Sequence, residues 1–351
     1  MITTYSYRIK DKSAGKHLDR MARDVNFVWN YCNDVIRRRW KESRKYTSRY
    51  DLQKLTRGGY TDLSINAQTI QVICKEITLR VSKVRGRVKF RSRGKSLGWV
   101  PFTNQRFRLQ NDTCTYSSLV FKFWSSRSLP DDAVIKCGSF NCNASGQWFV
   151  NVTFESNSPG LPTALVPDVG VDLGLRTQIT CSDDTKYERP NLTKKYEERL
   201  AKAQRAGKKR RTKKIHLNIK NTRSDWNHKA SNEIASKYSV IFVGSVSPSR
   251  LIKTKACGMA KSVNDAGWFQ FKTFLKYKAI KHSGSMYEIN ENYSTVTCST
   301  CSSRTGPSGL SDLGVRVWEC SSCNSVHDRD TNAALNILRS GRGTLKEEAA
   351  W

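Results

Sequence analysis

The chain has 351 residues, of which 61 are Lys or Arg and 30 are Asp or Glu, so its formal net charge is +31. Such an excess favours a polyanionic partner, with nucleic acid the first choice and an anionic membrane surface the second. No stretch approaches the ~20 consecutive apolar residues of a membrane span, and the first residues lack the apolar core of a secretory signal. Hydrophobic residues make up 38% of the chain, which excludes global disorder, and two or three domains are expected.

The first part of the chain predicts one strand followed by two helices. Residues 5–10 alternate between apolar and polar side chains, as in a half-buried strand. Apolar residues then recur at steps of three and four in residues 16–45 and again in 66–82, which predicts two amphipathic helices. Their remaining positions are rich in Lys and Arg, so we expect a helical element with a basic exposed face.

Residues 86–155 switch to short β segments separated by turn residues. The clearest predicted strands are residues 88–91, 119–123 and 148–154. An antiparallel barrel or sandwich fits this pattern, and the first strand of the chain can join it from a distance. Residues 156–167 contain three of the eight prolines and are interpreted as a linker.

The second half predicts strands that alternate with helices. Residues 169–175 and 239–244 are apolar enough to be buried strands, and residues 287–291 predict a third. A helix is expected at 260–281 and another at 330–338. Between the first two strands, residues 194–223 are dominated by Lys and Arg, which favours contact with phosphates over a merely solvated helix face.

Four of the 11 cysteines have the spacing of a metal site. Cys298 and Cys301 form one C-x2-C pair, and Cys320 and Cys323 form a second pair 18 residues later. This spacing is typical of a zinc ribbon, in which four thiolates close a tetrahedral structural Zn²⁺ site. Disulfides or free thiols are the alternative, but nothing in the sequence indicates an oxidising compartment. The other seven cysteines are scattered and are interpreted as small buried side chains.

Two carboxylates occupy positions that an ordinary fold would avoid. Asp172 lies inside an apolar strand between two glycines, where its charge needs a cation or strong hydrogen-bond donors. Asp330 begins the last predicted helix. A turn or cap role for Asp172 and a plain N-cap role for Asp330 are the alternatives.

Three of these features together resemble a known family. The sequence Gly-Val-Asp-Leu-Gly at 170–174, the paired cysteines and Asp-Arg-Asp-Thr-Asn-Ala-Ala at 328–334 occur in this order in TnpB (OrfB) proteins. These are RNA-guided nucleases carried by small insertion sequences, and they are relatives of the type V CRISPR effectors. The resemblance covers essentially the whole chain and is strongest from Gly170 onward, while residues 7–9 and 29–33 are less specific.

The resemblance implies an α+β, multidomain architecture. An N-terminal β-barrel, the wedge domain, would carry a helical recognition insertion, and an RNase H-like RuvC α/β domain with an inserted zinc ribbon would follow. The implied boundaries are 1–15 and 86–160 for the wedge, 16–85 for the recognition domain, 168–296 and 325–345 for the RuvC-like nuclease domain, and 297–324 for the zinc ribbon.

The resemblance also implies two-metal hydrolysis of phosphodiesters. Asp172 would be the first and Asp330 the last of three carboxylates that hold two Mg²⁺ ions ~4 Å apart. The family's usual middle Glu is absent, because Gly244 occupies that position. Either the protein is an inactive RNA-guided DNA-binding repressor, or another carboxylate takes the place of this Glu. We predict Glu291, at the end of the third strand; Glu288 and Asp265 are weaker alternatives.

Guide RNA and double-stranded target DNA are the partners that the resemblance implies, in a cytoplasmic, nucleoid-associated and preferably monomeric ribonucleoprotein. A small type V CRISPR effector and an unguided transposase are the other readings of the sequence. Trp29, Trp40, Tyr46 and Tyr50 are available for base stacking, although packing within the fold is the simpler expectation. The predicted phosphate contacts are Arg37, Arg38, Arg39, Arg44, Lys45, Lys208, Lys209, Arg210, Arg211, Lys213 and Lys214.

Overall fold

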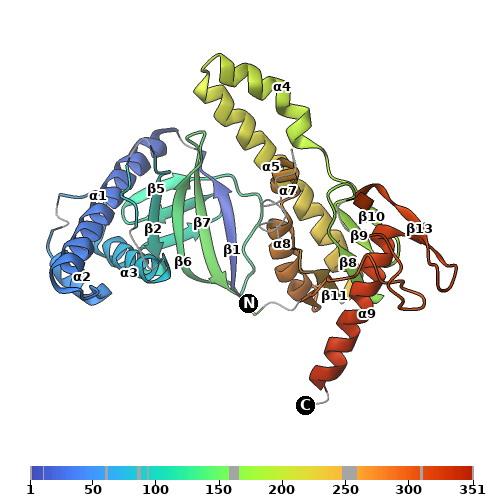
Figure 1. The fold of residues 1–351 in the computed structure, drawn as a ribbon. Helices are drawn as coiled ribbons and strands as arrows, with labels where there is room; N and C mark the ends of the chain where they lie inside the picture. The colour runs from blue at the N-terminus through green and yellow to red at the C-terminus, as the bar shows by residue number, and fades with distance from the viewer. Residues whose placement is uncertain are drawn as a thin grey trace. The chain divides into compact units, whose positions relative to one another are not determined.

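A computed structural model of the chain describes residues 2–10, 12–59, 62–84, 88–92, 95–157, 166–246, 259–308 and 311–349. Two compact units divide the chain, Met1–Ser158 and Pro159–Trp351, and each has its own core (Figure 1). Most of the predicted linker lies outside the described residues. Among the described helices, none is long and apolar enough to cross a membrane.

The helices of the first unit are α1 (Lys12–Ser43), α2 (Arg49–Leu55) and α3 (Ala67–Val84). The predicted helices at 16–45 and 66–82 are confirmed as α1 and α3, which pack together through their buried apolar stripes. The short α2 was not predicted. It begins at a capping box, in which the Ser48 hydroxyl accepts from the Asp51 N–H and the Asp51 carboxylate accepts from the Ser48 N–H.

The strands of the first unit form two antiparallel sheets. The larger has the order β1-β7-β6-β2 and joins β1 (Ile2–Arg8), β7 (Trp148–Glu155), β6 (Val134–Cys142) and β2 (Trp99–Thr103). The smaller joins β3 (Phe107–Gln110), β4 (Thr113–Tyr116) and β5 (Leu119–Lys122), with the short 3₁₀ helix η1 (Asn104–Arg106) before it. The prediction that the first strand joins from a distance is confirmed by its pairing with β7.

The predicted barrel is not closed within the described residues. The two sheets meet at a single isolated bridge, between Ile9 and Phe123. Aromatic packing holds the two sheets together instead: the Phe102 and Phe107 rings are stacked with their centroids 4.2 Å apart, and Phe140 lies against both.

The predicted strand at 88–91 is wrong. Side chains of α1 satisfy the backbone of this segment, so it has no need of a neighbouring strand. The Asn30 side chain exchanges two hydrogen bonds with the backbone of Arg91, and Asn33 and Arg37 both donate to the Val88 carbonyl.

A mixed five-stranded sheet forms the centre of the second unit. Its order is β10-β9-β8-β11-β12, built from β8 (Val166–Asp172), β9 (Ile179–Cys181), β10 (Lys186–Tyr187), β11 (Tyr238–Gly244) and β12 (Ser285–Ile289). The first three strands are antiparallel along the chain, and β11 and β12 both run parallel to β8. The three strands expected in this half of the chain are confirmed as β8, β11 and β12, but β12 ends at Ile289, which is its only buried residue, so Glu291 lies in the loop after it.

Helices cover both faces of this sheet. Alternate residues of β8 and β11, such as Val171 and Ile241, share one core with α5 (Lys209–Lys237) and α8 (Trp268–Lys281). Phe242 faces the other way and packs on Ile337 of α9 (Arg329–Ala349). The helix expected at 260–281 is interrupted, because Gly267 adopts a left-handed conformation with φ 62° between α7 (Met259–Ala266) and α8. The basic region at 194–223 folds into α4 (Leu192–Arg205) and the first part of α5, a helical hairpin.

The segment between β12 and α9 carries the cysteine pairs. It contains the short 3₁₀ helix η2 (Ser311–Gly314) and an antiparallel hairpin of β13 (Val317–Glu319) and β14 (Val326–Asp328). Trp318 is buried there with Cys298 and Cys320.

Candidate carboxylate centre and cysteine cluster

The carboxylate of Asp172 lies at the carboxyl end of β8, on the face that α9 covers. Strand residues alternate between faces, so Asp172 shares its face with Gly170. A Cβ at Gly170 would overlap the backbone of Ala334 and Leu338, so glycine there allows α9 to pack directly on the strand. Burial raises the pKa of Asp172 to about 8, and the negative charges of two nearby carboxylates add to this effect.

Those two carboxylates are Asp330 and Glu291. The structure therefore brings together the three acids that the sequence analysis selected, from β8, from the loop after β12 and from α9. Two other groups partly oppose the rise in the pKa of Asp172, the Leu173 N–H and the charge of Arg329.

Glu291 occupies space that Gly244 leaves open. The parallel pairing of β11 with β12 sets Gly244 beside Ile289, and the Ser245 N–H donates to the Ile289 carbonyl at 2.8 Å. Glu291 therefore lies two residues past the end of this pairing. A Cβ at Gly244 would overlap Oε2 of Glu291 and lie 3.2 Å from Cδ1 of Ile337. A side chain at 244 and the present position of Glu291 are thus mutually exclusive.

Burial raises the pKa of Glu291, while the Lys272 ammonium and the Val246 N–H act in the opposite direction. Glu288, the weaker alternative, faces elsewhere and forms an ion pair with Lys272 at 2.6 Å. Asp265 lies in a buried ion pair with Arg189 at 3.1 Å, which gives it a structural partner away from the carboxylate centre.

Asp330 lies in the first turn of α9 but does not cap that helix. The cap is Asp328, whose Oδ1 accepts from the N–H groups of Asp330 and Thr331, each at 3.0 Å. Burial would raise the pKa of Asp328, but the Thr331 N–H and the Lys186 ammonium outweigh it and hold that pKa below its ordinary value. The Asp330 carboxylate is therefore left to face Arg316, whose guanidinium lies 3.4 Å away.

This arrangement has the chemistry of a divalent-cation site. Three carboxylates converge, burial raises the pKa of Asp172 and of Glu291, and hard oxygen donors are the ligands that Mg²⁺ prefers. Among the described residues, however, only the cysteines form a group of three or more candidate ligands whose atoms all lie within 4.8 Å of one another. The carboxylates lie further apart than the cysteine sulfurs do. This separation suits a site for two cations better than a site for one.

The four predicted zinc cysteines do form that tight group. Cys298, Cys301, Cys320 and Cys323 are all free thiols, and their sulfur atoms lie within 4.8 Å of one another. Cys298 and Cys320 are fully buried, while Cys301 is exposed. The pKa of Cys320 is lowered to about 5, mainly by hydrogen bonds from the hydroxyls of Ser303 and Thr305, and this favours the thiolate.

Both cysteine pairs are folded by the same turn. In the first, the Ser302 N–H donates to the Cys298 carbonyl at 2.9 Å, and in the second the Asn324 N–H donates to the Cys320 carbonyl at 2.8 Å. Ser302 and Asn324 both have positive φ, 67° and 57°. Each turn therefore folds its two sulfurs toward the same point, which is the geometry expected of four ligands to one Zn²⁺ ion.

His327 is a further residue of this cluster that was not predicted from the sequence. Its Nε2 lies 3.0 Å from the sulfur of Cys298, and its ring packs on Trp318 with the centroids 4.9 Å apart. The only indication of this role in the sequence is the position of His327, four residues after Cys323. An imidazole N–H at this place can donate to a thiolate and stabilise its charge.

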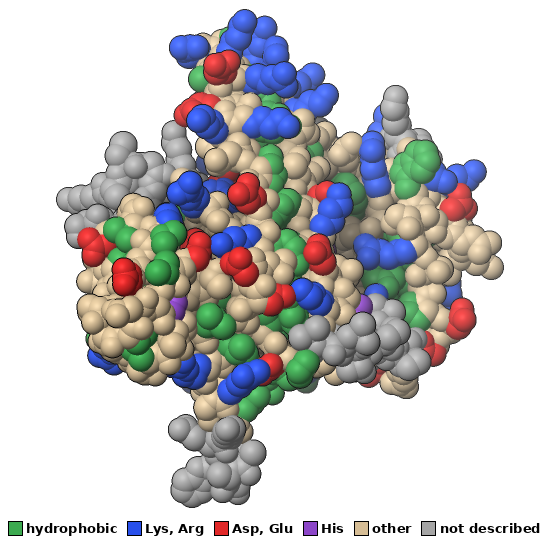
Figure 2. Space-filling model, turned by 90° about the vertical axis from the view of Figure 1, so that its right-hand side faces the viewer, with side chains coloured by type: hydrophobic (Ala, Val, Ile, Leu, Met, Phe, Trp, Pro, Cys, Tyr) green, Lys and Arg blue, Asp and Glu red, His purple; other side chains and the backbone are tan. Residues whose placement is uncertain are grey.

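The predicted phosphate contacts fall into two groups. Arg38 and Arg39 form ion pairs with Asp34 and Asp51, so much of their charge is already balanced. The basic run 208–214 begins α5 at the corner of the α4–α5 hairpin, where, among the described residues, no carboxylate pairs with it. Figure 2 shows lysines and arginines gathered at the tip of this hairpin, at the top of the view.

Two family matches cover most of the second unit. Residues 161–253 match the family described as "Probable transposase" (OrfB_IS605), and residues 268–337 match the family described as "Cas12f1-like, TNB domain".

Curated relatives carry a common name. The chain is 29% identical over 269 residues to a "Putative RNA-guided DNA endonuclease" of Streptomyces pristinaespiralis, a match that spans 72% of this chain and 65% of the relative. It is 28% identical over 228 residues to the "Putative RNA-guided DNA endonuclease InsQ" of Escherichia coli K12, across 57% of this chain and 55% of the relative. The chain thus spans less than two thirds of the length of either relative.

A solved structure has a similar fold. The chain in a Cas12f1–sgRNA–target DNA complex superposes with a TM-score of 0.60 at 12% identity, over 93% of this chain and 83% of that one. This likeness concerns the fold alone. The two successive family matches and the named relatives show that the second unit is similar to OrfB_IS605 and Cas12f1-like proteins.

Proposed function

We propose that this protein is an RNA-guided DNA endonuclease, and that Asp172, Glu291 and Asp330 are its catalytic carboxylates. The observation that carries this proposal is the fit between Gly244 and Glu291. The family's usual glutamate position has no side chain, and the carboxylate of Glu291 occupies the space that a side chain there would need. The names of the relatives from Streptomyces and Escherichia coli support the same activity.

The sheet order supports assigning the second unit to the RNase H-like, RuvC type. Three antiparallel strands are followed by two that run parallel to the first, and α9 crosses the face that carries Asp172. Within this unit, residues 168–296 and 325–345 would form the nuclease domain and 297–324 the zinc ribbon. In the first unit, residues 1–15 and 86–160 would form the wedge and 16–85 the recognition domain.

Two Mg²⁺ ions would be held by the three carboxylates, and when bound they would activate a water molecule and stabilise the leaving oxygen. Without a bound cation, the chain's own residues disfavour the state in which all three carboxylates are charged. Asp172 holds a proton near neutral pH, because burial and its two acidic neighbours raise its pKa to about 8. Arg316 and Arg329 balance part of the remaining negative charge.

A structural Zn²⁺ would be held by the four cysteines. The donor set fits this ion, since four free sulfurs converge from two matching turns and hydroxyl groups stabilise the thiolate of Cys320. Because β14 leads directly into α9, a bound Zn²⁺ would fix the start of the helix that carries Asp330.

Guide RNA and double-stranded target DNA would be the partners, held through the basic end of α1 and the tip of the α4–α5 hairpin. We place the resulting ribonucleoprotein, as a monomer, in the cytoplasm at the nucleoid. Base pairing with the guide would select the target, while the protein contacts backbones and shape.

A repressor that binds guided DNA without cutting it is the second candidate function. Gly244 is the observation that favours it, because the family's usual ligand is missing there. The two functions differ in one measurable property, which is Mg²⁺-dependent cleavage.

The decisive experiment uses the protein copurified with its RNA. Sequencing that RNA defines the guide, and a plasmid with the matching target tests cleavage in Mg²⁺. We expect Glu291→Ala to abolish cutting while target binding survives, and Glu288→Ala, an exposed neighbour, to leave cutting intact. Normal cutting by Glu291→Ala would refute the role of Glu291. Failure of the unmodified ribonucleoprotein to cut while it still binds would establish the repressor.

A further inference from the structure

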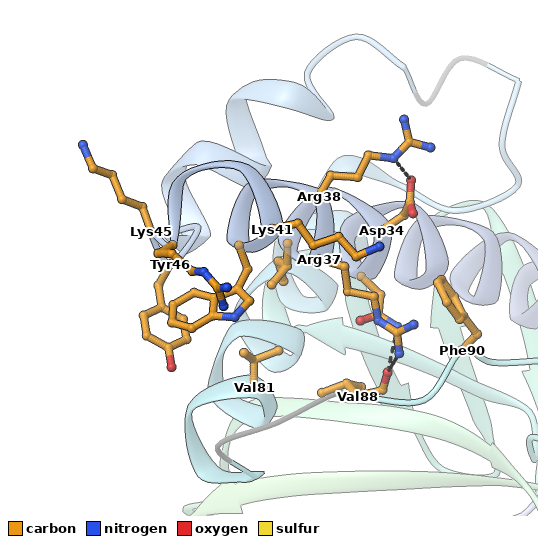
Figure 3. A pocket seen from close by; sticks show the side chains of 13 residues that line it. Asp34, Arg37, Arg38, Lys41, Lys45, Tyr46, Val81, Val88 and Phe90 are labelled. Atoms are coloured by element: carbon orange, nitrogen blue, oxygen red, sulfur yellow. Dashed lines mark hydrogen bonds and ion pairs between the residues drawn. The ribbon is translucent and has the colours of Figure 1, made fainter.

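The carboxyl end of α1 lines a cavity of about 730 Å³ together with α3 and residues 88–90. This volume falls in the ~300–1,000 Å³ range of small-molecule sites. Figure 3 shows Val81 and Val88 facing the underside of α1, and Arg37 pointing down to the Val88 carbonyl. With Ile36 and Phe90, these valines form an apolar floor.

Positive charge surrounds this floor. Arg37, Arg38, Lys41, Arg44 and Lys45 all line the cavity, and Lys45 extends away from it into solvent (Figure 3). The single carboxylate among the lining residues belongs to Asp34, which is paired with Arg38 at 2.8 Å. The cavity is therefore cationic, a property that selects for an anionic ligand.

Two exposed aromatic rings form a shelf at the same place. The rings of Trp40 and Tyr46 lie 4.7 Å apart with an interplanar angle of 36°, and they are 37% and 66% exposed. Arg44, which follows the last residue of α1 and has a positive φ of 55°, lies over the Trp40 ring. Phe90 is 49% exposed, with the Arg37 guanidinium 4.4 Å above its ring. Such flat faces beside cations are what base stacking uses.

Arg37 has donor capacity that the described protein does not use. One of its terminal nitrogens donates to the Val88 carbonyl at 2.6 Å, but its buried Nε has no hydrogen-bond partner among the described residues. The hydrogen bond to Val88 and the contact with the Phe90 ring thus hold the Arg37 guanidinium at the cavity wall.

We propose that this cavity binds one unpaired nucleotide of a single strand, an inference that rests on the nucleic-acid binding proposed for the end of α1 but not on the carboxylates. The base stacks on the Trp40–Tyr46 shelf above the apolar floor, and Lys41 and Arg44 contact its phosphates. A paired base cannot bind in this way, since its faces are covered within the duplex. Unpaired nucleotides of guide RNA and of unwound DNA both offer a base and phosphates, and the binding test distinguishes RNA from DNA.

The test measures binding of fluorescein-labelled strands to the full chain. The probes are RNA of about ten uridines, an abasic strand of equal length, a blunt RNA duplex and a matching thymidine DNA. We expect Trp40→Ala and Tyr46→Ala each to weaken uridine RNA binding by about tenfold, as loss of one stacked base implies, with little change for the abasic strand and the duplex. Trp124→Ala is the matched control, because Trp124 is 59% exposed but lies outside the cavity.

Each outcome decides the proposal. Equal losses for uridine, abasic and duplex probes, or no loss for any, would overturn it in favour of a plain phosphate surface. A loss confined to uridine RNA identifies RNA as the source of the nucleotide, and a loss with thymidine DNA as well extends the site to DNA.

A variant at an exposed lysine of the cavity provides a test that does not depend on correct folding of the aromatic variants. Lys41→Gln, an exposed change, should weaken every single-stranded probe about threefold and lower the salt dependence of binding. Lys54→Gln on α2 is its control and should change neither. Photo-crosslinking of RNA that contains 4-thiouridine should mark the peptide with Trp40 and Tyr46, and crosslinks that avoid this peptide would contradict the proposal.

Discussion

The two clusters of candidate metal ligands in the second unit are assembled in opposite ways. The four cysteines come from two matching turns in one short segment, and their sulfurs lie within 4.8 Å of one another. The carboxylates come from β8, the loop after β12 and the first turn of α9, so residues 172, 291 and 330 meet only when the sheet and its covering helix are in place.

This difference shows what each site needs from the rest of the fold. Local turns suffice to bring four thiols together, and each turn is visible as a C-x2-C pair. Three carboxylates repel one another, so their approach must be stabilised by packing elsewhere, here the contact of α9 with Gly170. Substitutions in the two clusters test the contrast between a site that local turns form and a site that only the tertiary fold forms.

The largest expected effect comes from moving the middle carboxylate. Gly244→Glu alone should displace the Glu291 carboxylate, because the new side chain overlaps its Oε2 atom. Glu291→Ala alone should reduce Mg²⁺-dependent cleavage by about a thousandfold, as loss of one metal ligand costs several kcal/mol. The double variant Gly244→Glu/Glu291→Ala should regain at least a tenth of the lost rate, measured as plasmid cleavage.

A double variant no more active than Glu291→Ala would show that the two positions are not interchangeable. Gly244→Ala with Glu291→Ala is the control, since it adds bulk without a carboxylate and should stay inactive.

Disruption of the cysteine cluster should have a large but local effect. Cys320→Ser should release Zn²⁺ and unfold the turns around it, because binding energy at structural zinc sites is folding energy of the order of ~10 kcal/mol. We expect about one zinc per chain in the unmodified protein by metal analysis, and its loss in the variant. Cys181→Ser, at a buried cysteine of β9, should keep the metal. A variant that retains zinc at full occupancy would contradict the assignment of all four cysteines as zinc ligands.

The charge repulsion at the carboxylates should appear as a pH-dependent stability. The pKa of Asp172 is about 8 in the fold, against 3.8 ordinarily, so the folded state holds this proton more tightly than the unfolded state. Without Mg²⁺, the free energy of unfolding should therefore fall as pH rises from about 4 to 8. Asp172→Asn removes this titration and should be more stable than the unmodified protein above pH 8.

Urea unfolding of the zinc-loaded protein at both ends of this pH range provides the measurement. Added Mg²⁺ should raise the stability of the unmodified protein and leave Asp172→Asn almost unchanged. A variant that is less stable than the unmodified protein at high pH would contradict the raised pKa.

The smallest expected effect concerns the cap that leaves Asp330 available. Asp328→Ala should lower the free energy of unfolding by about 1 kcal/mol, since Asp328 accepts from two N–H groups at the start of α9. Thermal unfolding measures this change. Asp225→Ala, which removes an exposed ion pair with Lys229 on α5, should cost less than ~0.5 kcal/mol. Equal effects of the two changes would argue against Asp328 as the cap.

Sequence periodicity and spacing were sufficient for the local features. The helices α1 and α3, the strands β8 and β11 and the cysteine pairs were all predicted, because each depends on residues that are near one another in the chain. The strand expected at 88–91 failed for the opposite reason: its backbone hydrogen bonds go to side chains of α1, which are distant in the sequence. The break at Gly267 was also missed, since one glycine within an apolar pattern does not reveal its left-handed conformation.

The identities of Asp172, Glu291 and Asp330 came from the sequence, through their positions and the resemblance to TnpB. Only the tertiary structure decided which neighbours they have, because parallel pairing of β11 with β12 sets the loop after Ile289 beside Gly244. It alone also showed that Asp328 caps α9 and that His327 faces Cys298. The positive charge that first indicated nucleic acid is a sum over the whole chain. Its concentration around the Trp40–Tyr46 shelf arises from folding, because α1, α3 and residues 88–90 must meet before a cavity exists.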